Sequence, residues 1–123
     1  DDASEHAATA ETNLAYALWE FGRTEEALEH AERAVEIDER FAEAWYNRGF
    51  FLLERGLAED ALNAFDNAIR LGHRNTRILE EKARALEEMG EFDRAEEVAQ
   101  EAEEMREEAD ADLVDEQQQQ QLE

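Results

Sequence analysis

The side chains best suited to acid–base or metal chemistry are three histidines and many carboxylates. His6, His30 and His73 are not preceded at three residues by a carboxylate, as the Glu-x-x-His pattern of di-metal bundles requires, and no His-Glu-x-x-His sequence occurs. Glu26 lies one helical turn before His30, so we expect these two residues to form a solvent-exposed ion pair. The spacing therefore predicts no metal site.

Other catalytic patterns are also missing. The chain has no Cys, which excludes thiolate nucleophiles, thiolate metal sites and disulfides. Neither a Gly-x-Gly-x-x-Gly sequence nor a phosphate-binding loop is present. Pairs such as Glu80-Glu81 and Glu87-Glu88 are typical of a solvated helix face, whereas catalytic carboxylates need a pocket that separates their pKa values. We expect no enzymatic activity and no cofactor.

The charge and hydropathy of the chain restrict its partners. Its 123 residues include 35 acidic and 12 basic side chains, for a net charge of −23. Such a chain repels a polyanion, so we expect no nucleic-acid partner. The longest strictly apolar run, residues 50–53, is far shorter than the roughly 20 residues of a membrane-spanning helix. These features predict a single domain with no membrane insertion, and we expect a cytoplasmic location.

The basic residues are unusual in type, because Lys82 is the only lysine beside eleven arginines. An acidic surface poor in lysine suits a protein in concentrated salt, where screening removes self-repulsion. A GC-rich genome that favours arginine codons, combined with an acidic helical surface, explains the same composition. The sequence leaves both interpretations open.

An internal repeat organises most of the chain. Gly22, Gly56 and Gly90 are 34 residues apart, which divides the sequence into units at 8–41, 42–75 and 76–109. Four further sets of small or apolar residues keep the same step: Ala15, Gly49 and Ala83; Leu18, Leu52 and Leu86; Ala27, Ala61 and Ala95; Ala34, Ala68 and Ala102. Five positions that keep one period through three copies predict three copies of one structural unit.

Each unit is predicted to contain two amphipathic helices around its glycine. The glycines follow helical patterns and permit the backbone of a helix C-terminus. Carboxylates come within three residues after each glycine, where the positive end of a second helix favours them. Apolar residues in the second halves recur at spacings of three and four, and no segment alternates convincingly with period two. The chain is therefore predicted to be all-α.

A 34-residue helix–turn–helix unit with these residues resembles the tetratricopeptide repeat. Unit two matches best, through the residues Ala44-Trp45-Tyr46-Asn47-Arg48-Gly49, Gly56, Ala61-Leu62, Phe65 and Ala68. Glu11, Arg48 and Lys82 depart from the family pattern, and the inter-repeat proline is replaced by Glu39, His73 and Glu107. The resemblance implies a right-handed α-solenoid of three repeats over residues 8–109.

The flanking residues do not belong to the repeats. Residues 1–7 either extend the first helix or fray. Residues 110–123 are acidic and rich in glutamine, so we expect a helix that continues and then becomes disordered. Leu122-Glu123 resembles a cloning remnant, and the missing initiator methionine suggests a segment of a longer protein. No amphipathic capping helix follows unit three, so Val98, Met105, Leu113 and Val114 are either open or buried by another subunit.

The resemblance also implies a concave groove lined by the first helix of each unit. Carried onto this chain, the groove positions are Thr9, Thr12, Asn13, Tyr16 and Glu20; Glu43, Tyr46, Asn47, Phe50 and Glu54; and Arg77, Glu80, Glu81, Arg84 and Glu88. Some family members bind the C-terminal carboxylate of heat-shock chaperones through a Lys/Asn/Asn/Lys/Arg clamp. Asn47 and Arg77 match that clamp in type, but Thr12, Tyr16 and Glu81 do not. We therefore expect the clamp to be absent. The alternative is that Asn47, Arg77 and Arg84 form an anion site in its place.

The charge is spread unevenly over the units, with −6, −1 and −8 along the chain. The nearly neutral middle unit contains the aromatic set Trp45, Tyr46, Phe50 and Phe51, of which we assign Trp45 and Phe51 to packing. Tyr46 and Phe50 suit packing and binding equally. We predict a protein-interaction scaffold whose groove anchors a neutral or basic peptide on aromatic side chains. The alternative is a structural domain that forms homo-oligomers through its uncapped last helix.

Overall fold

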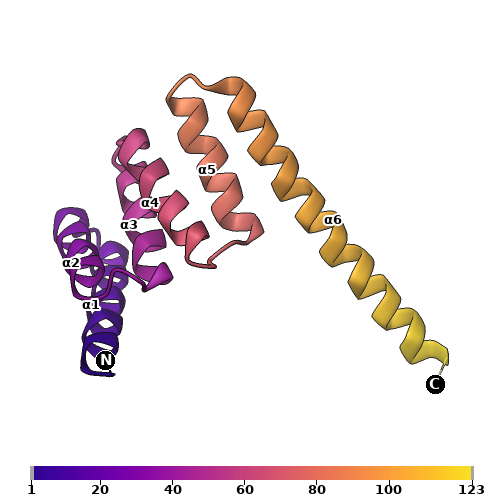
Figure 1. Cartoon of the computed structure of the whole chain (residues 1–123), viewed down its shortest axis with the longest axis horizontal. Coiled ribbons are helices and arrows are strands. Elements are labelled where there is room, and N and C mark those ends of the chain that lie inside the picture. The colour runs from indigo at the N-terminus through magenta and orange to yellow at the C-terminus, as the bar shows by residue number, and fades with distance from the viewer. Residues whose placement is uncertain (1, 123) are drawn as a thin grey trace.

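The computed structural model describes residues 2–122, and all regular structure in this range is helical. The helices are α1 (Asp2–Glu20), α2 (Thr24–Ile37), α3 (Ala42–Glu54), α4 (Ala58–Arg70), α5 (Thr76–Glu88) and α6 (Phe92–Leu122). They form three antiparallel pairs that follow one another along the array (Figure 1). The predicted all-α, helix–turn–helix architecture is confirmed.

The three repeated glycines end the first helix of each pair, as predicted. Gly22, Gly56 and Gly90 have φ angles of 81°, 81° and 80°, in the left-handed region that glycine adopts without steric cost. At the first turn the Gly22 amide donates to the Trp19 carbonyl at 2.9 Å, and the Arg23 amide donates to the Leu18 carbonyl at 2.9 Å. These two bonds satisfy carbonyls that the helix end would leave unpaired. The next helix then begins at Thr24.

The contacts between pairs define which helices lie on the inside of the curve. α1 packs on α3 and α3 packs on α5, whereas the described residues of α2, α4 and α6 form no contacts with one another. The first helices of the pairs are therefore closer together than the second helices. This arrangement makes α1, α3 and α5 the concave side of the array.

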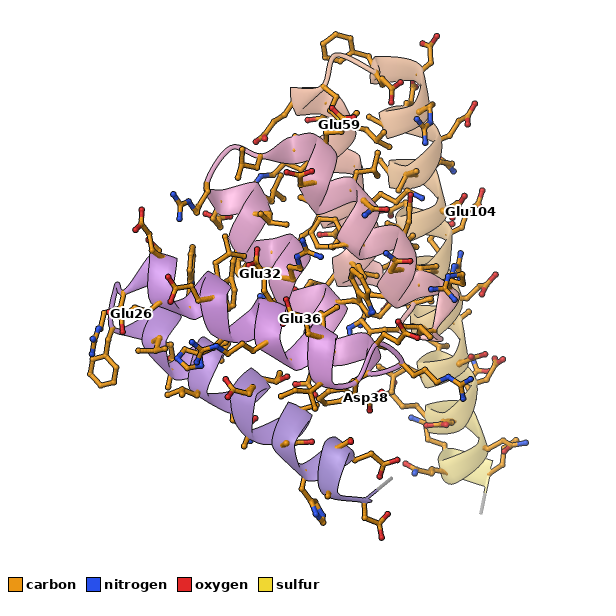
Figure 2. The ribbon with its side chains drawn as sticks, turned by 60° about the vertical axis from the view of Figure 1, so that its left-hand side comes forward. Glu26, Glu32, Glu36, Asp38, Glu59 and Glu104 are labelled. Carbon is orange, nitrogen blue, oxygen red and sulfur yellow. The ribbon has the colours of Figure 1, made fainter. Side chains whose placement is uncertain are left out.

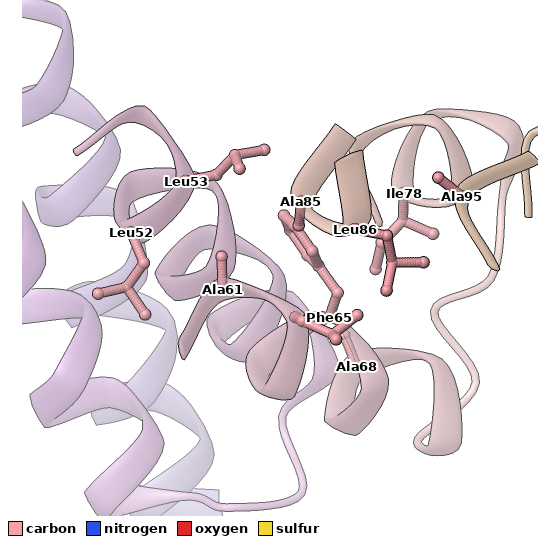
Figure 3. Close-up of a cluster of buried hydrophobic side chains, with 10 residues drawn as sticks. Leu52, Leu53, Ala61, Phe65, Ala68, Ile78, Ala85, Leu86 and Ala95 are labelled. Carbon is pink, nitrogen blue, oxygen red and sulfur yellow. The ribbon is translucent and has the colours of Figure 1, made fainter. Parts of the chain in front are cut away.

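The core is continuous between the second and third pairs. Leu52 and Leu53 of α3, Phe65 of α4, and Ile78 and Leu86 of α5 belong to one buried cluster (Figure 3). Close approach of α3 and α4 depends on Gly49, because a Cβ atom there would lie 2.7 Å from two ring carbons of Phe65. The small residue that recurs in the repeat is thus explained by packing.

The last helix is longer than a repeat requires. α6 has 31 residues, and the sequence after Gly90 contains no further glycine or proline to end it. Every described residue after Arg106 is exposed, including Leu113 at 54% and Val114 at 50%, while Val98 and Met105 are partly buried. The tail that we expected to become disordered is helical to Leu122, because nothing in its sequence interrupts the helix. Asp1 and Glu123 lie outside the described residues.

Acidic side chains cover much of the outer surface. Figure 2 shows examples from α2, α4 and α6, among them the exposed Glu36, Glu59 and Glu104. None of the helices within residues 2–122 combines the length and the apolar character needed to cross a membrane.

Candidate functional site

A pocket of about 480 Å³ lies on the concave side. Its walls come from α1, α3, the start of α5 and the turn before α5. The lining residues are Thr12, Asn13, Tyr16, Glu43, Tyr46, Asn47, His73, Asn75 and Arg77. The structure therefore brings residues from all three repeats around one hollow.

Seven of the fifteen predicted groove positions line this pocket: Thr12, Asn13, Tyr16, Glu43, Tyr46, Asn47 and Arg77. The repeat period assigned these residues to the first helix of each unit. One face of each first helix packs on the first helix of the next unit. His73 and Asn75 also line the pocket, although neither was predicted as a groove residue, because both lie in a turn between repeats. The signal that Asn75 offered was its type, since its side-chain oxygen accepts the Ile78 amide at 2.9 Å and caps α5.

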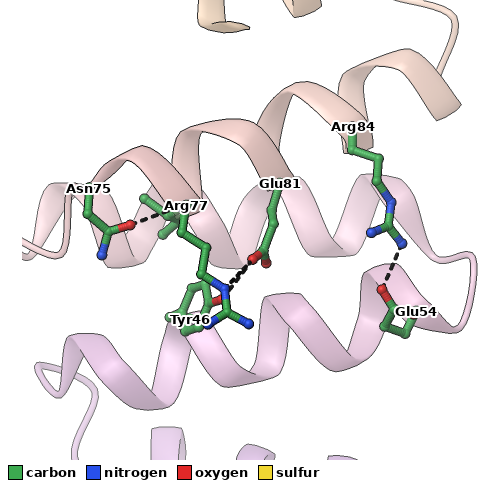
Figure 4. Close-up of polar contacts among 7 residues, drawn as sticks. Tyr46, Glu54, Asn75, Arg77, Glu81 and Arg84 are labelled. Carbon is green, nitrogen blue, oxygen red and sulfur yellow. Dashed lines mark hydrogen bonds and ion pairs between the residues drawn. The ribbon is translucent and has the colours of Figure 1, made fainter. Parts of the chain in front are cut away.

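Two other predicted groove residues, Glu81 and Arg84, form polar links between α3 and α5 (Figure 4). The Tyr46 hydroxyl donates to Glu81 Oε1 at 2.8 Å, and Arg77 Nε donates to the same oxygen at 3.1 Å. Burial, followed by the hydrogen bond to Glu81, raises the pKa of the Tyr46 hydroxyl above its ordinary value. The other Glu81 oxygen is buried and has no hydrogen-bond partner among the described residues. Glu81 thus connects two repeats and neutralises Arg77.

A second link lies farther along the same two helices. Arg84 Nη2 lies 2.7 Å from Glu54 Oε1, and the hydrogen bond to this carboxylate raises the pKa of Arg84. Both arginines of the alternative anion site that we considered are therefore paired with carboxylates. The third member, Asn47, carries no charge, so this set contains no unpaired cation.

The aromatic residues of the middle repeat pack against neighbours on both sides. Phe50 lies on Trp19, with ring centroids 5.4 Å apart, and the Arg77 guanidinium lies 5.9 Å from the Phe50 ring centroid. Tyr46 stacks on His73 at 5.1 Å. Phe50 and Tyr46 are each partly buried, so both side chains contribute to packing.

Trp45 and Phe51 have the packing role that we assigned to them. Phe51 is fully buried, and Trp45 Nε1 donates to the Glu39 carbonyl at 2.8 Å while its ring packs against the core. These two side chains hold α3 in place and contribute nothing to the pocket lining.

Several polar groups in the pocket have no partner within residues 2–122. Asn47 is only 8% exposed, yet its carboxamide makes no hydrogen bond there. The exposed Asn13 and Tyr16 form none either, and Glu43 takes part in no ion pair. The polar atoms of Asn47 are not among the buried unpaired atoms of the described residues, so its carboxamide is open to the pocket and free to bind a ligand.

The structure places the histidines in different surroundings, and one of them pairs with a carboxylate. His30 Nδ1 lies 2.5 Å from Glu11 Oε2, and both side chains are largely buried between α1 and α2. The predicted exposed pair of His30 with Glu26 is wrong, because Glu26 binds Arg23 instead. Within the described part of the chain, no group of three or more His, Cys, Asp and Glu residues is arranged to hold a metal ion.

The sequence matches one model of a known protein family. The family model described as tetratricopeptide repeat matches residues 12–75 and 51–112. No curated protein matches the sequence significantly.

Solved structures resemble the array in fold. YrrB, described as a TPR protein with an unusual peptide-binding site, is 26% identical with a TM-score of 0.74; the match covers 79% of this chain and 50% of YrrB. MamA is 23% identical with a TM-score of 0.78 over 85% of this chain and 61% of MamA. The second TPR of Spaghetti, bound to an HSP90 peptide, is 20% identical with a TM-score of 0.78 over 85% of this chain and 99% of that domain. The chain thus spans about half of YrrB and three fifths of MamA.

Proposed function

Because the chain belongs to the tetratricopeptide repeat family, we propose that it is a non-catalytic protein-interaction module that binds a peptide segment in its concave groove. The observation that carries this proposal is the pocket between α1, α3 and α5, where unpaired polar groups converge beside aromatic rings. Pockets of this composition orient a ligand through a few polar contacts and bind it through apolar area. The peptide-binding site in the description of YrrB supports the same use of the fold.

The charge of the chain favours a neutral or basic peptide. With a net charge of −23, the protein attracts cationic segments over long range and repels acidic ones. This attraction acts mainly on the association rate and weakens as salt is added. A scaffold or adaptor that recruits basic segments is the role that fits these properties.

A selection experiment tests this function. A phage library of random 12-residue peptides is panned against the immobilised protein, and the affinity of an enriched synthetic peptide is measured by fluorescence anisotropy. The key variant is Tyr16→Ala, because Tyr16 is 52% exposed and makes no hydrogen bond within residues 2–122. Alanine at Tyr46 or Phe50 would also remove packing and is less informative.

We expect Tyr16→Ala to weaken binding by about tenfold or more, as for an aromatic anchor at an interface. The matched control is Glu36→Ala on the outer helix α2, which leaves affinity within about twofold. A library that enriches no peptide, or a peptide whose affinity is unchanged by Tyr16→Ala, would contradict groove binding.

Self-association is the second candidate function, and one observation favours it. Leu113 and Val114 are about half exposed on a helix that extends beyond the array. A second copy that packs along α6 would cover them. Light scattering over a concentration series tests this, and a monomer at the highest concentration excludes it.

A further inference from the structure

We propose that the pocket on the concave side receives a lysine or arginine side chain of the bound peptide, with Glu43 as its counter-charge. This inference rests on the proposed function and adds the chemistry of the residue that is recognised. It is carried by three features of the pocket: its uncompensated charge, an unpaired polar acceptor in its wall and its aromatic walls.

The first feature is the charge balance of the lining. Two charged residues line the pocket, Glu43 and Arg77. Arg77 is neutralised by Glu81, whose carboxylate is mostly buried and lies 3.1 Å from Arg77 Nε. Glu43 has no such partner within residues 2–122 and is exposed to the hollow. The charge left for a ligand to neutralise is therefore negative.

The second feature is the carboxamide of Asn47, one helical turn after Glu43 on α3. It is more than nine-tenths buried, lines the pocket and makes no hydrogen bond within the described part of the chain. Its oxygen is an acceptor that suits the N–H groups of an ammonium or guanidinium. Glu43 and Asn47 face the same hollow, so one cation can bind both.

The third feature is the pair of tyrosine rings from neighbouring repeats. Tyr16 of α1 and Tyr46 of α3 both line the pocket. Aromatic faces attract cations, and the groove already shows this contact, since the Arg77 guanidinium lies over the Phe50 ring. The same walls also pack against the aliphatic stem of a long basic side chain.

An anionic side chain fits the pocket poorly. It would meet the free carboxylate of Glu43, and the cations on this face, Arg77 and Arg84, are bound to Glu81 and Glu54. Breaking either pair would leave a carboxylate without its counter-charge, which costs free energy. The pocket therefore favours cationic side chains over anionic ones.

The test uses three short capped peptides and ¹⁵N-labelled protein. Acetyl-Gly-Arg-Gly-amide, acetyl-Gly-Gln-Gly-amide and acetyl-Gly-Glu-Gly-amide are titrated at low salt, and affinities come from the side-chain and backbone amide shifts of Asn13 and Asn47. We expect the arginine peptide to bind at least about fivefold more tightly than the glutamine peptide, and the glutamate peptide to bind most weakly.

Two variants separate local recognition from net charge. Glu43→Gln should reduce arginine-peptide affinity about fivefold, whereas Glu20→Gln, which removes the same charge from another exposed position of the concave face, should change it less than about twofold. Equal affinity for the three peptides, shifts away from the pocket, or equal effects of both variants would overturn the inference. Library-selected peptides that depend on Tyr16 yet lack lysine and arginine would overturn it while leaving the proposed function intact.

Discussion

Tyr46 shows how a single residue serves both packing and the shape of the groove. Its ring contacts His73 and Phe65, and its hydroxyl binds Glu81 of the next repeat. The sequence placed Tyr46 in the groove from the repeat register but left packing and binding equal, because the partner on α5 lies 35 residues away. Spacing along one helix carries no information about such a contact.

Tyr46→Phe tests the link between repeats. Removing the hydroxyl takes one donor from a mostly buried carboxylate, so we expect a loss of about 1–3 kcal/mol in the free energy of unfolding. Urea denaturation measures it. The matched control is Tyr16→Phe, whose hydroxyl has no partner within residues 2–122 and whose loss should cost less than about 0.5 kcal/mol. Equal effects in the two variants would contradict the role of the Tyr46 hydrogen bond.

The ionisation of Tyr46 gives a second measurement. Its pKa in the folded protein is raised above the ordinary value of 10.0, so the folded state binds the proton more tightly than the unfolded state. The contribution to stability is therefore complete below pH 10 and is lost as the pH rises through the folded pKa. Absorbance at 295 nm in the Tyr16→Phe variant should show phenolate formation above pH 10. A midpoint at or below the ordinary value would contradict the hydrogen-bonded geometry.

At the level of helices, the ends of the first helices follow from local sequence, whereas side-chain pairings between helices do not. The three repeated glycines predicted where the first helix of each pair ends, because left-handed backbone needs no neighbouring helix to explain it. The pairing of His30 was predicted wrongly, since its partner Glu11 belongs to the neighbouring helix α1. The helix that we expected to give way to disorder within residues 110–123 continues to Leu122, because no residue after Gly90 breaks a helix.

Gly49→Ala tests the close approach of α3 and α4. The added methyl group would lie 2.7 Å from the Phe65 ring, so we expect a net loss of about 1–3 kcal/mol despite the better helix propensity of alanine. Thermal or urea unfolding measures the change. The double variant with Phe65→Leu should lose less free energy of unfolding than the sum of the two single losses, because the smaller side chain makes room for the methyl group. Simple additivity would show that the crowding lies elsewhere.

Shortening the chain after Ala109 tests whether the end of α6 supports the array. No described residue beyond Arg106 is buried, so the free energy of unfolding should change by less than about 0.5 kcal/mol. Circular dichroism should show only the loss of the removed helix. If the shortened chain is clearly less stable than the full chain only at high protein concentration, the removed segment associates with a second copy.

For the whole molecule, the dominant property is a charge of −23 on a curved array of helices. The repeat period predicted the solenoid because each unit must bury its apolar face on the next, and the family match over residues 12–112 agrees with it. The depth of the pocket and the pairing of Arg84 with Glu54 were not predictable, since they depend on how far neighbouring repeats are rotated relative to each other. The pair of Arg77 with Glu81 lies within α5 at a spacing of four residues, which local sequence does indicate.

The acidic surface predicts that salt stabilises the fold. At 1 M salt the screening length falls to about 3 Å, which suppresses repulsion among exposed carboxylates. We expect the melting temperature to rise between 0.05 and about 1 M KCl. Glu29→Gln, Glu36→Gln, Glu59→Gln and Glu96→Gln in one chain neutralise exposed carboxylates outside the ion pairs and should flatten this rise. A melting temperature independent of salt would count against both self-repulsion and adaptation to concentrated salt.

A peptide bound on the concave side can be located by mapping the ¹⁵N chemical shifts that a library-selected peptide causes. We expect saturable shifts on α1, α3 and α5, centred on Asn13, Asn47 and Tyr46, with little change on α2 and α4. Shifts concentrated on the outer helices or on the end of α6 would contradict it.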